Sequence, residues 1–536
     1  MKNEFEIQGT PVSAGIGIGK AFFAEKTLFR SGESRSPAEE KKRYDRATEK
    51  FAESAEKEGE KLKTAVSEKD GEILFAHASL ACDSFVRDAV HKEIEGGMSA
   101  EAAAQAVWHQ WKEALEMSSD EYVRERASDT EDVLSGILLS LQGEEGSFEI
   151  PNGCILVCDT FTPSLAAKSS SVSGVIARKG GETSHGAILA RAMGLPCIFG
   201  ADTKKISAGQ EIICDGECGV IIVSPFHDTV KKYERLRMER LEAAACAEKY
   251  AFLPVMTSDG RKISVEANAG NLGDVERAAK SGCDGIGLFR TEFLFLERNE
   301  PPTEDEQYSV YSRAAALMGG RPVTVRTLDV GGDKKIPYLS FPAEDNPFLG
   351  LRGIRFSLKE KDLFKTQLRA VLRASAKGNI KILLPMITDE REVFEAKEAI
   401  EACKRELADD GKAFSEKTEV GIMIETPAAA LCAGELSRCA DFFSVGTNDL
   451  VQYVTACDRG NENVSYLYDP MSKGVKIAVD FAVSGARKGN IPCHICGEAA
   501  SDGEFLDYLK EIGAGGVSVS PWSVAQVKYR LICGEK

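Results

Sequence analysis

One histidine stands in a setting suited to phosphoryl chemistry. The chain has only six histidines, and His185 lies in the run GGETSHGAILAR at 180–191, among glycines and small hydroxyl residues. A helix is expected to begin there, and the backbone N–H groups at a helix N-terminus attract anions. A neutral imidazole is also a competent nucleophile for a phosphoryl group. These features indicate a phosphate-carrying histidine, although a histidine in such a turn is more often a capping or structural residue.

Arginines in three later motifs could bind an anionic substrate. The motifs are GLFRTEFL at 287–294, RTLDVGGDK at 326–334 and NPFLGLR at 346–352. A ligand with a phosphate and a carboxylate needs several bidentate donors, and the planar guanidinium supplies them without losing its proton. We expect Arg290 and Arg326 to bind phosphate. Arg352 and Lys334 would support them, whereas any one arginine taken alone would more often form a surface ion pair.

Two further motifs carry carboxylates suited to a divalent cation. Glu425 begins the run ETP, and Asp449 lies in GTNDL at 446–450. Mg²⁺ prefers oxygen ligands and usually takes one or two protein carboxylates together with substrate oxygens and water. Such an ion, Mg²⁺ or Mn²⁺, would offset charge during phosphoryl transfer. The alternative is that these polar residues only cap helices.

The run CHICGE at 493–498 contains two cysteines three positions apart. A CxxC pair can be a redox pair or half of a zinc site. The chain has no second CxxC, which argues against zinc. On a strand, Cys493 and Cys496 would point to opposite faces, which disfavours a disulfide between them.

The chain of 536 residues is too long for one core, so two to four domains are expected, and we expect a multidomain α/β fold. From about residue 256 onward, apolar runs alternate with helical stretches, which suggests a (β/α)8 TIM-like barrel. The eight expected strands cover 263–269, 285–292, 323–329, 351–355, 380–386, 420–426, 442–448 and 492–498. The strand C-termini form the active face of such barrels, and most of the polar residues above follow these runs.

The remaining chain indicates three further parts. We expect a discontinuous α/β phosphohistidine domain from 1–33 and 145–226, an all-α insert at 34–144, a linker helix at 227–255 and the barrel at 256–536. A capping box from Ser36 to Glu39 predicts the start of the insert, with helix breaks near 69–71 and 96–97. Four apolar residues of the insert could dock a partner, but we expect them to pack in its helical core: Leu74, Phe75, Leu80 and Phe85.

The composition of the chain restricts the classes of partner and the cellular compartment that we expect. The net charge of −17 argues against nucleic acid and anionic membranes, and is compatible with a basic protein partner. No apolar run reaches the roughly 18 residues of a membrane span. The N-terminal run MKNEFEIQGT has no apolar core of a signal peptide. We therefore expect a cytoplasmic protein without membrane insertion.

The sequences of these motifs resemble those of a known family. The run GG-x-TSH, followed by A-R, resembles the phosphohistidine domain shared by enzyme I of the phosphoenolpyruvate-dependent sugar phosphotransferase system, phosphoenolpyruvate synthase and pyruvate phosphate dikinase. The three arginine motifs, ETPAA, GTNDL with the later Asp458-Arg459, and CGE are similar to the same family. The resemblance implies that His185 is phosphorylated on Nε2 and that Asn448 and Arg459 contact the substrate. It also implies that Cys496 protonates the enolate of pyruvate.

The helical insert distinguishes among the members. Enzyme I has such a domain, which docks the histidine-containing phosphocarrier protein HPr, whereas the other two enzymes carry a large ATP-binding domain for which this chain has no room. The resemblance therefore implies a phosphotransferase that serves the first step of sugar uptake and forms a homodimer through its barrel. The alternatives are a catalytically weak regulatory phosphocarrier and a relative of phosphoenolpyruvate synthase without the ATP domain.

Overall fold

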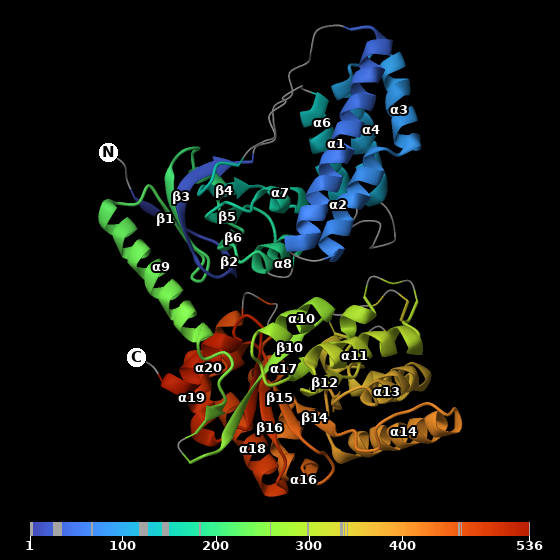
Figure 1. Ribbon diagram of the computed structural model, residues 1–536, viewed down its shortest axis with the longest axis vertical. Coiled ribbons are helices and arrows are strands. Elements are labelled where there is room, and N and C mark those ends of the chain that lie inside the picture. The colour runs from blue at the N-terminus through green and yellow to red at the C-terminus, as the bar shows by residue number, and fades with distance from the viewer. Residues whose placement is uncertain are drawn as a thin grey trace. The chain divides into compact units, whose positions relative to one another are not determined.

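The computed structural model describes residues 4–24, 35–65, 68–116, 127–141, 150–181, 184–257, 259–296, 298, 300–332, 336, 338–339, 341–342, 344–458, 461 and 464–534. The chain divides into two compact units, Met1–Leu241 and Glu242–Lys536. Helix α9 (His227–Glu248) crosses the boundary between them (Figure 1).

The first unit contains an eight-stranded mixed sheet with the order β1-β8-β7-β3-β4-β5-β6-β2. Its strands are β1 (Phe5–Gln8), β2 (Thr10–Ser13), β3 (Ile16–Phe23), β4 (Ile155–Cys158), β5 (Gly174–Ala177), β6 (Cys197–Phe199), β7 (Glu211–Asp215) and β8 (Val220–Val223). Strand β3 pairs in parallel with β4, so residues before and after the helical stretch share one sheet. Strands β4 and β5 are buried throughout, as expected for parallel strands covered on both faces. Helices α7 (Pro163–Lys168) and α8 (His185–Ala192) and the turn η1 (Thr203–Lys205) connect the later strands.

Between β3 and β4 the first unit is helical. The helices are α1 (Pro37–Ala65), α2 (Glu68–Ala81), α3 (Ser84–Glu95), α4 (Ala100–Glu116) and α6 (Ala127–Leu141). The Glu39 carboxylate accepts the Ser36 backbone N–H over 3.0 Å at the start of α1. Helix α1 ends at Ala65 and α2 begins at Glu68, so the two helices separate a few residues before the break predicted near 69–71. Gly71 instead lies inside α2, where a Cβ would come within 2.7 Å of the Gly59 carbonyl oxygen, so the glycine permits close packing of the two helices.

The predicted core of the insert is only partly correct. Leu80 is partly buried against the helical core around Tyr44 and Trp108. Leu74 is fully buried, but it packs with Leu156 and Phe161 in the core of the sheet domain. Phe85 is 69% exposed, so it does not pack in that core. The reason is its position at the second residue of α3, whose buried face carries Val86, Val90 and Ile94.

The second unit is a closed barrel of eight parallel strands, which confirms the predicted multidomain α/β fold class with a TIM-like barrel. The strands are β10 (Lys262–Ala269), β11 (Ile286–Phe289), β12 (Val323–Arg326), β13 (Ile380–Leu384), β14 (Val420–Ile424), β15 (Phe443–Gly446), β16 (Cys493–Cys496) and β17 (Gly516–Val519). Strand β10 closes the barrel by pairing with both β11 and β17, and the short β9 (Val255–Met256) pairs antiparallel to β10.

Helices surround these strands (Figure 1). They are α10 (Leu272–Lys280), α11 (Glu304–Met318), α12 (Ile354–Lys359), α13 (Lys361–Ser375), α14 (Glu390–Asp409), α15 (Pro427–Leu431), α16 (Ala433–Leu436), α17 (Thr447–Thr455), α18 (Lys473–Gly489), α19 (Gly503–Ile512) and α20 (Val524–Cys533). Single turns η2 (Glu292–Leu294), η3 (Pro347–Leu349), η4 (Ser465–Leu467) and η5 (Glu498–Ser501) lie in the loops.

One of the eight strand predictions is wrong. The run LRGIR at 351–355 is a loop that leads into α12, and Gly353 there has φ +57°, outside the range of a strand. The eighth strand is β17, which pairs with both β16 and β10. Its sequence GVSV follows a glycine-rich turn and has only two large apolar residues, so its apolar signal is weak.

Candidate functional site

The backbone places His185 at the first residue of α8, directly after the N-cap Ser184. The Ser184 hydroxyl donates to the Gly181 carbonyl oxygen over 2.8 Å, so it closes the preceding turn and does not cap the helix. A Cβ at Gly186 would come within 2.4 Å of the Phe161 carbonyl oxygen, so glycine is required for α8 to pack there. Thr183 lies outside the described residues.

The sequence-predicted residues of the barrel gather at one end of it. Arg290 and Glu425 directly follow β11 and β14, and Arg326 and Cys496 are the last residues of β12 and β16. Asn448 and Asp449 lie in the first turn of α17, directly after β15. All eight strands are parallel, so these ends share the C-terminal face that forms the active site in such barrels. Lys334 and Arg459 lie outside the described residues.

Arg326 is buried in a carboxylate-rich setting. Its Nη2 donates to Glu292 Oε1 over 2.6 Å, and its Nη1 lies 3.4 Å from Asp329 Oδ2. Burial alone would lower the pKa of Arg326, but the charges of Glu292 and Asp329 outweigh it and raise that pKa. Arg326 therefore stays charged, and the two carboxylates hold its guanidinium in place.

Arg352 joins two loops of the site. Its Nη2 donates to both Asp329 oxygens, over 3.2 and 3.1 Å, and its Nη1 donates to Asp449 Oδ1 over 3.0 Å. The same Nη1 donates to the Tyr453 hydroxyl over 3.1 Å. Arg352 thus reaches the site although it does not end a strand.

Glu425 is a buried carboxyl with an unusual charge environment. The Met386 backbone N–H donates to its Oε1 over 2.6 Å, and Met386 has φ +57°. Burial, followed by repulsion from Asp449 and Asp329, raises the pKa of Glu425 well above its usual value, although Arg326 and Arg352 act in the opposite direction. Glu425 and Asp449 are therefore near enough to repel each other, and a divalent cation between them would relieve that repulsion.

The carboxylates fit a magnesium-type ion better than a protein-only metal centre. Among the described residues, no group of three or more His, Cys, Asp or Glu side chains is arranged to hold a metal. Magnesium usually takes one or two protein carboxylates and completes its shell with substrate oxygens and water. Glu425 and Asp449 supply two such carboxylates.

Cys496 is a protonated thiol inside the barrel. It is 2% exposed, and its Sγ donates to the Val445 carbonyl oxygen over 3.2 Å. The Ser444 hydroxyl donates to the same Sγ over 3.4 Å. Burial raises the pKa of Cys496 to about 11, so the thiol keeps its proton at neutral pH. Cys493 instead packs in the core between the strands and the outer helices, and both cysteines are free.

Asn448 is held by the turn after β16. Its Oδ1 accepts the Glu498 backbone N–H over 3.0 Å, and its Nδ2 donates to Glu498 Oε1 over 3.4 Å. Gly497 has φ +107°, and a Cβ there would lie 2.1 Å from Thr447 Oγ1. Glycine in the CGE motif is thus required to bring Cys496 and Asn448 into one site.

Arg290 differs from the other arginines of the site. Its side chain is partly exposed, and in the described part of the chain its guanidinium has no hydrogen-bond or ion-pair partner. It nevertheless acts on the buried thiol, because its charge lowers the pKa of Cys496 against the larger effect of burial.

Sequence reasoning did not single out Glu292, Asp329 and Tyr453, which hold the two buried arginines. Glu292 and Asp329 lie within the arginine motifs themselves, so a search for carboxylates in those motifs would have found them. Tyr453 lies in the run GTNDLVQY at 446–453, but that pattern does not predict its contact with Arg352.

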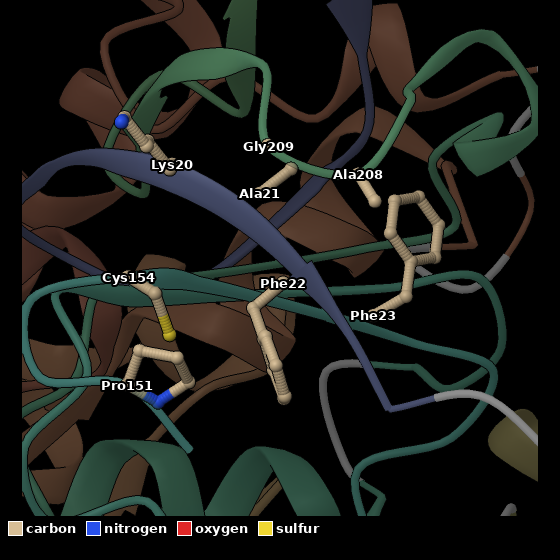
Figure 2. Close-up of a pocket in the computed structure, with 8 residues that line it drawn as sticks. All are labelled: Lys20, Ala21, Phe22, Phe23, Pro151, Cys154, Ala208 and Gly209. Atoms are coloured by element: carbon tan, nitrogen blue, oxygen red, sulfur yellow. The ribbon is translucent and has the colours of Figure 1, made fainter.

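The first unit also contains a cavity of about 390 Å³, shown in Figure 2. It lies beside Lys20–Phe23 of β3, with Pro151, Cys154, Ala208 and Gly209 around it. None of the residues with predicted chemistry lines it. The cavity therefore takes no part in the chemistry considered for this chain.

Comparison with known proteins agrees with this arrangement. Residues 245–534 match the family described as PEP-utilising enzyme, PEP-binding domain. Residues 8–126 and 150–219 match the N-terminal and mobile domains of PEP-utilising enzymes. No helix in the described ranges has both the length and the apolar character that a bilayer crossing demands.

Three curated relatives span nearly the same length. The phosphoenolpyruvate-protein phosphotransferase of Bacillus subtilis (strain 168) is 37% identical over 540 residues, which cover 98% of this chain and 94% of that protein. The same-named protein of Priestia megaterium is 38% identical, covering 98% and 93%, and that of Haloferax volcanii is 41% identical, covering 88% and 83%. The chain therefore belongs to the phosphoenolpyruvate-protein phosphotransferases, the enzyme I family.

Proposed function

We propose that this chain transfers the phosphoryl group of phosphoenolpyruvate to its own His185 and then to a histidine of the phosphocarrier protein HPr, releasing pyruvate. This is the first step of sugar uptake by the phosphotransferase system. The observation that carries the proposal is the guanidinium of Arg290, which has no partner among the described residues and acts on the protonated thiol of Cys496 near the carboxylates Glu425 and Asp449.

In the first step, His185 attacks phosphorus and the bond from phosphorus to the enol oxygen breaks. Arg290 and Arg326 bind the phosphate, and Asn448, Arg459, Arg352 and Lys334 complete the binding of the substrate. Glu425 and Asp449 would hold Mg²⁺ or Mn²⁺, which would supply positive charge to offset that of the transferring group. The enolate electrons then take the Cys496 proton onto the methylene carbon, which gives pyruvate and a thiolate.

In the second step, the domain with His185 moves away from the barrel and meets the carrier. The reacting histidine and the barrel site belong to different domains, so the mechanism requires this movement. We propose that HPr docks on the helical insert, where Phe85 is exposed beside Trp111, with ring centroids 6.2 Å apart. The net charge of −17 favours a basic carrier.

We also propose a homodimer through the barrel. The exposed apolar and aromatic residues of the second unit include Leu431, Tyr466, Ile477 and Phe481, each exposed by 45% or more. Ile477 and Phe481 lie four positions apart on α18, so they share one face of that helix. A second copy of the chain would cover this face.

The test is incubation with radiolabelled phosphoenolpyruvate and Mg²⁺, beside a His185→Ala variant. We expect acid-labile, base-stable label on the intact chain, none on the variant, and chase of the label by purified HPr. Label that HPr does not remove would favour the relative of phosphoenolpyruvate synthase. A folded chain that takes no label at high substrate would contradict the transferase function and favour a regulatory binding protein.

A further inference from the structure

A half-buried histidine, His494, lies in the barrel two residues before Cys496. Strand side chains alternate between faces, so His494 and Cys496 point to the same side of β16. That side is the lumen, because Cys496 packs there with Leu288, Leu383 and Met423. His494 Nδ1 lies 2.9 Å from Glu266 Oε2. Nothing in the phosphoryl chemistry above uses this pair.

A small cavity lies between the His494–Glu266 pair and Ser444, which is a neighbour of the Cys496 thiol. Its volume is about 50 Å³, and Glu266, His494 and Ser444 all line it, with Lys381 and Thr324. Ser444 is paired with His494 in the strand register and donates to Cys496 Sγ over 3.4 Å. A polar cavity of more than roughly 15 Å³ can hold water. The serine hydroxyl thus separates the catalytic thiol from a polar space at the other end of the barrel.

The charges around His494 favour its protonated form. Burial opposes protonation, but the charge and hydrogen bond of Glu266 outweigh it, and the pKa of His494 is raised above its ordinary 6.5. Lys381 acts against this rise and Asp284 supports it. Lys381 is itself paired with Glu419, with Nζ 2.6 Å from Oε2, so its charge is partly offset. The His494 side chain remains 23% exposed, which gives it access to solvent protons.

Each turnover of the proposed function leaves Cys496 as a thiolate that must regain a proton. We propose that His494, oriented by Glu266, returns this proton through cavity water and the Ser444 hydroxyl. The inference rests on the role of Cys496 in the proposed function. Ser444 gives its proton to the thiolate and takes one from a cavity water, and that water takes one from the imidazolium. The imidazole then regains a proton from solvent, so protons and charges balance.

The route can be tested by comparing two exchanges in one reaction. The enzyme is mixed with phosphoenolpyruvate, carbon-labelled pyruvate and Mg²⁺ in D₂O, without a carrier. Carbon label entering phosphoenolpyruvate reports reversible phosphoryl transfer. Deuterium entering the pyruvate methyl group reports exchange of the Cys496 proton with solvent. The ratio of deuterium to carbon exchange isolates the proton route from overall activity.

We expect this ratio to fall by about tenfold or more in His494→Asn and Ser444→Ala, since a positioned proton-transfer group typically contributes on the order of 100-fold. Free imidazole should restore the ratio in His494→Ala. His109→Asn, an exposed histidine of α4, is the matched control and should keep the wild-type ratio.

The outcomes are distinct. An unchanged ratio in both His494→Asn and Ser444→Ala would overturn the inference, because the proton would then come from the substrate face. If His494→Asn loses carbon exchange, its ratio of deuterium to carbon exchange cannot be measured. The ratio in Ser444→Ala then tests the proton route, since that variant leaves the His494–Glu266 pair intact. Absence of carbon exchange in the wild type would contradict the proposed function, and the inference would fall with it.

Discussion

Arg352 donates to Asp449 over 3.0 Å although 97 residues separate them in the chain. The same guanidinium holds Asp329 with its other nitrogen, so one buried cation keeps two carboxylates in place. Because Asp449 is a proposed metal ligand, this ion pair sets the position of the metal site.

Replacement of Arg352 by alanine should destabilise the barrel. Removing one partner of a buried ion pair leaves the other uncompensated and costs about 3–5 kcal/mol. We expect a lower thermal midpoint and loss of phosphohistidine formation. Arg405→Ala, at an exposed site on α14, should change stability by no more than about 0.5 kcal/mol. An unchanged midpoint for Arg352→Ala would show that the two carboxylates do not need this cation.

Replacement of Arg290 should separate activity from stability. Its guanidinium has no partner in the described part of the chain, so Arg290→Gln should shift the stability by no more than about 0.5 kcal/mol. Loss of a charge aimed at the transferring group should slow phosphohistidine formation on the order of 100-fold or more. The measurements are thermal denaturation and rapid-quench labelling, and wild-type labelling rates would exclude Arg290 from substrate binding.

Replacement of Gly497 should disturb the turn after Cys496. A Cβ there would meet Thr447 Oγ1 at 2.1 Å and Asn448 Oδ1 at 2.8 Å, and φ is +107°. We expect Gly497→Ala to cost about 1–3 kcal/mol and to raise the KM for phosphoenolpyruvate. The control is Gly434→Ala in α16, where a Cβ meets nothing within 4 Å and the change should be neutral or mildly stabilising. Equal effects of the two changes would contradict the steric argument.

Removal of divalent cations should stop phosphohistidine formation. We expect EDTA to abolish labelling and added Mg²⁺ or Mn²⁺ to restore it. Asp449→Asn should raise the required Mg²⁺ concentration by about tenfold or more, since even residues behind a ligand can cost that much affinity. Asp409→Asn, on the exposed side of α14, should not change it. Full labelling in EDTA would argue against any metal.

The His494–Glu266 pair should make barrel stability depend on pH. The folded pKa of His494 is raised, so its contribution is fully present below the unfolded value of about 6.5 and is lost as pH rises through the folded pKa. The thermal midpoint of wild type relative to His494→Asn should therefore fall with rising pH across that window. The thermal midpoint of His109→Asn should follow that of the wild type at each pH. A difference between wild type and His494→Asn that does not change with pH would show that protonation of His494 does not affect stability.

The sequence by itself determined most of the local structure and the list of reacting groups. Seven of the eight barrel strands were predicted from apolar runs, because a buried parallel strand needs a continuous apolar sequence. The motifs named Arg290, Arg326, Glu425, Asp449 and Cys496, since their chemistry resides in residue type.

Only the tertiary structure decided which of these groups meet. Barrel closure sets the contacts of Arg352 with Asp329 and Asp449, and no local pattern encodes an ion pair across 97 residues. Strand β17 owes its formation to hydrogen bonding with β16 and β10, not to a strong apolar run of its own. The pairing of His494 with Glu266, 228 positions apart, likewise follows from the alternation of side chains into a closed lumen.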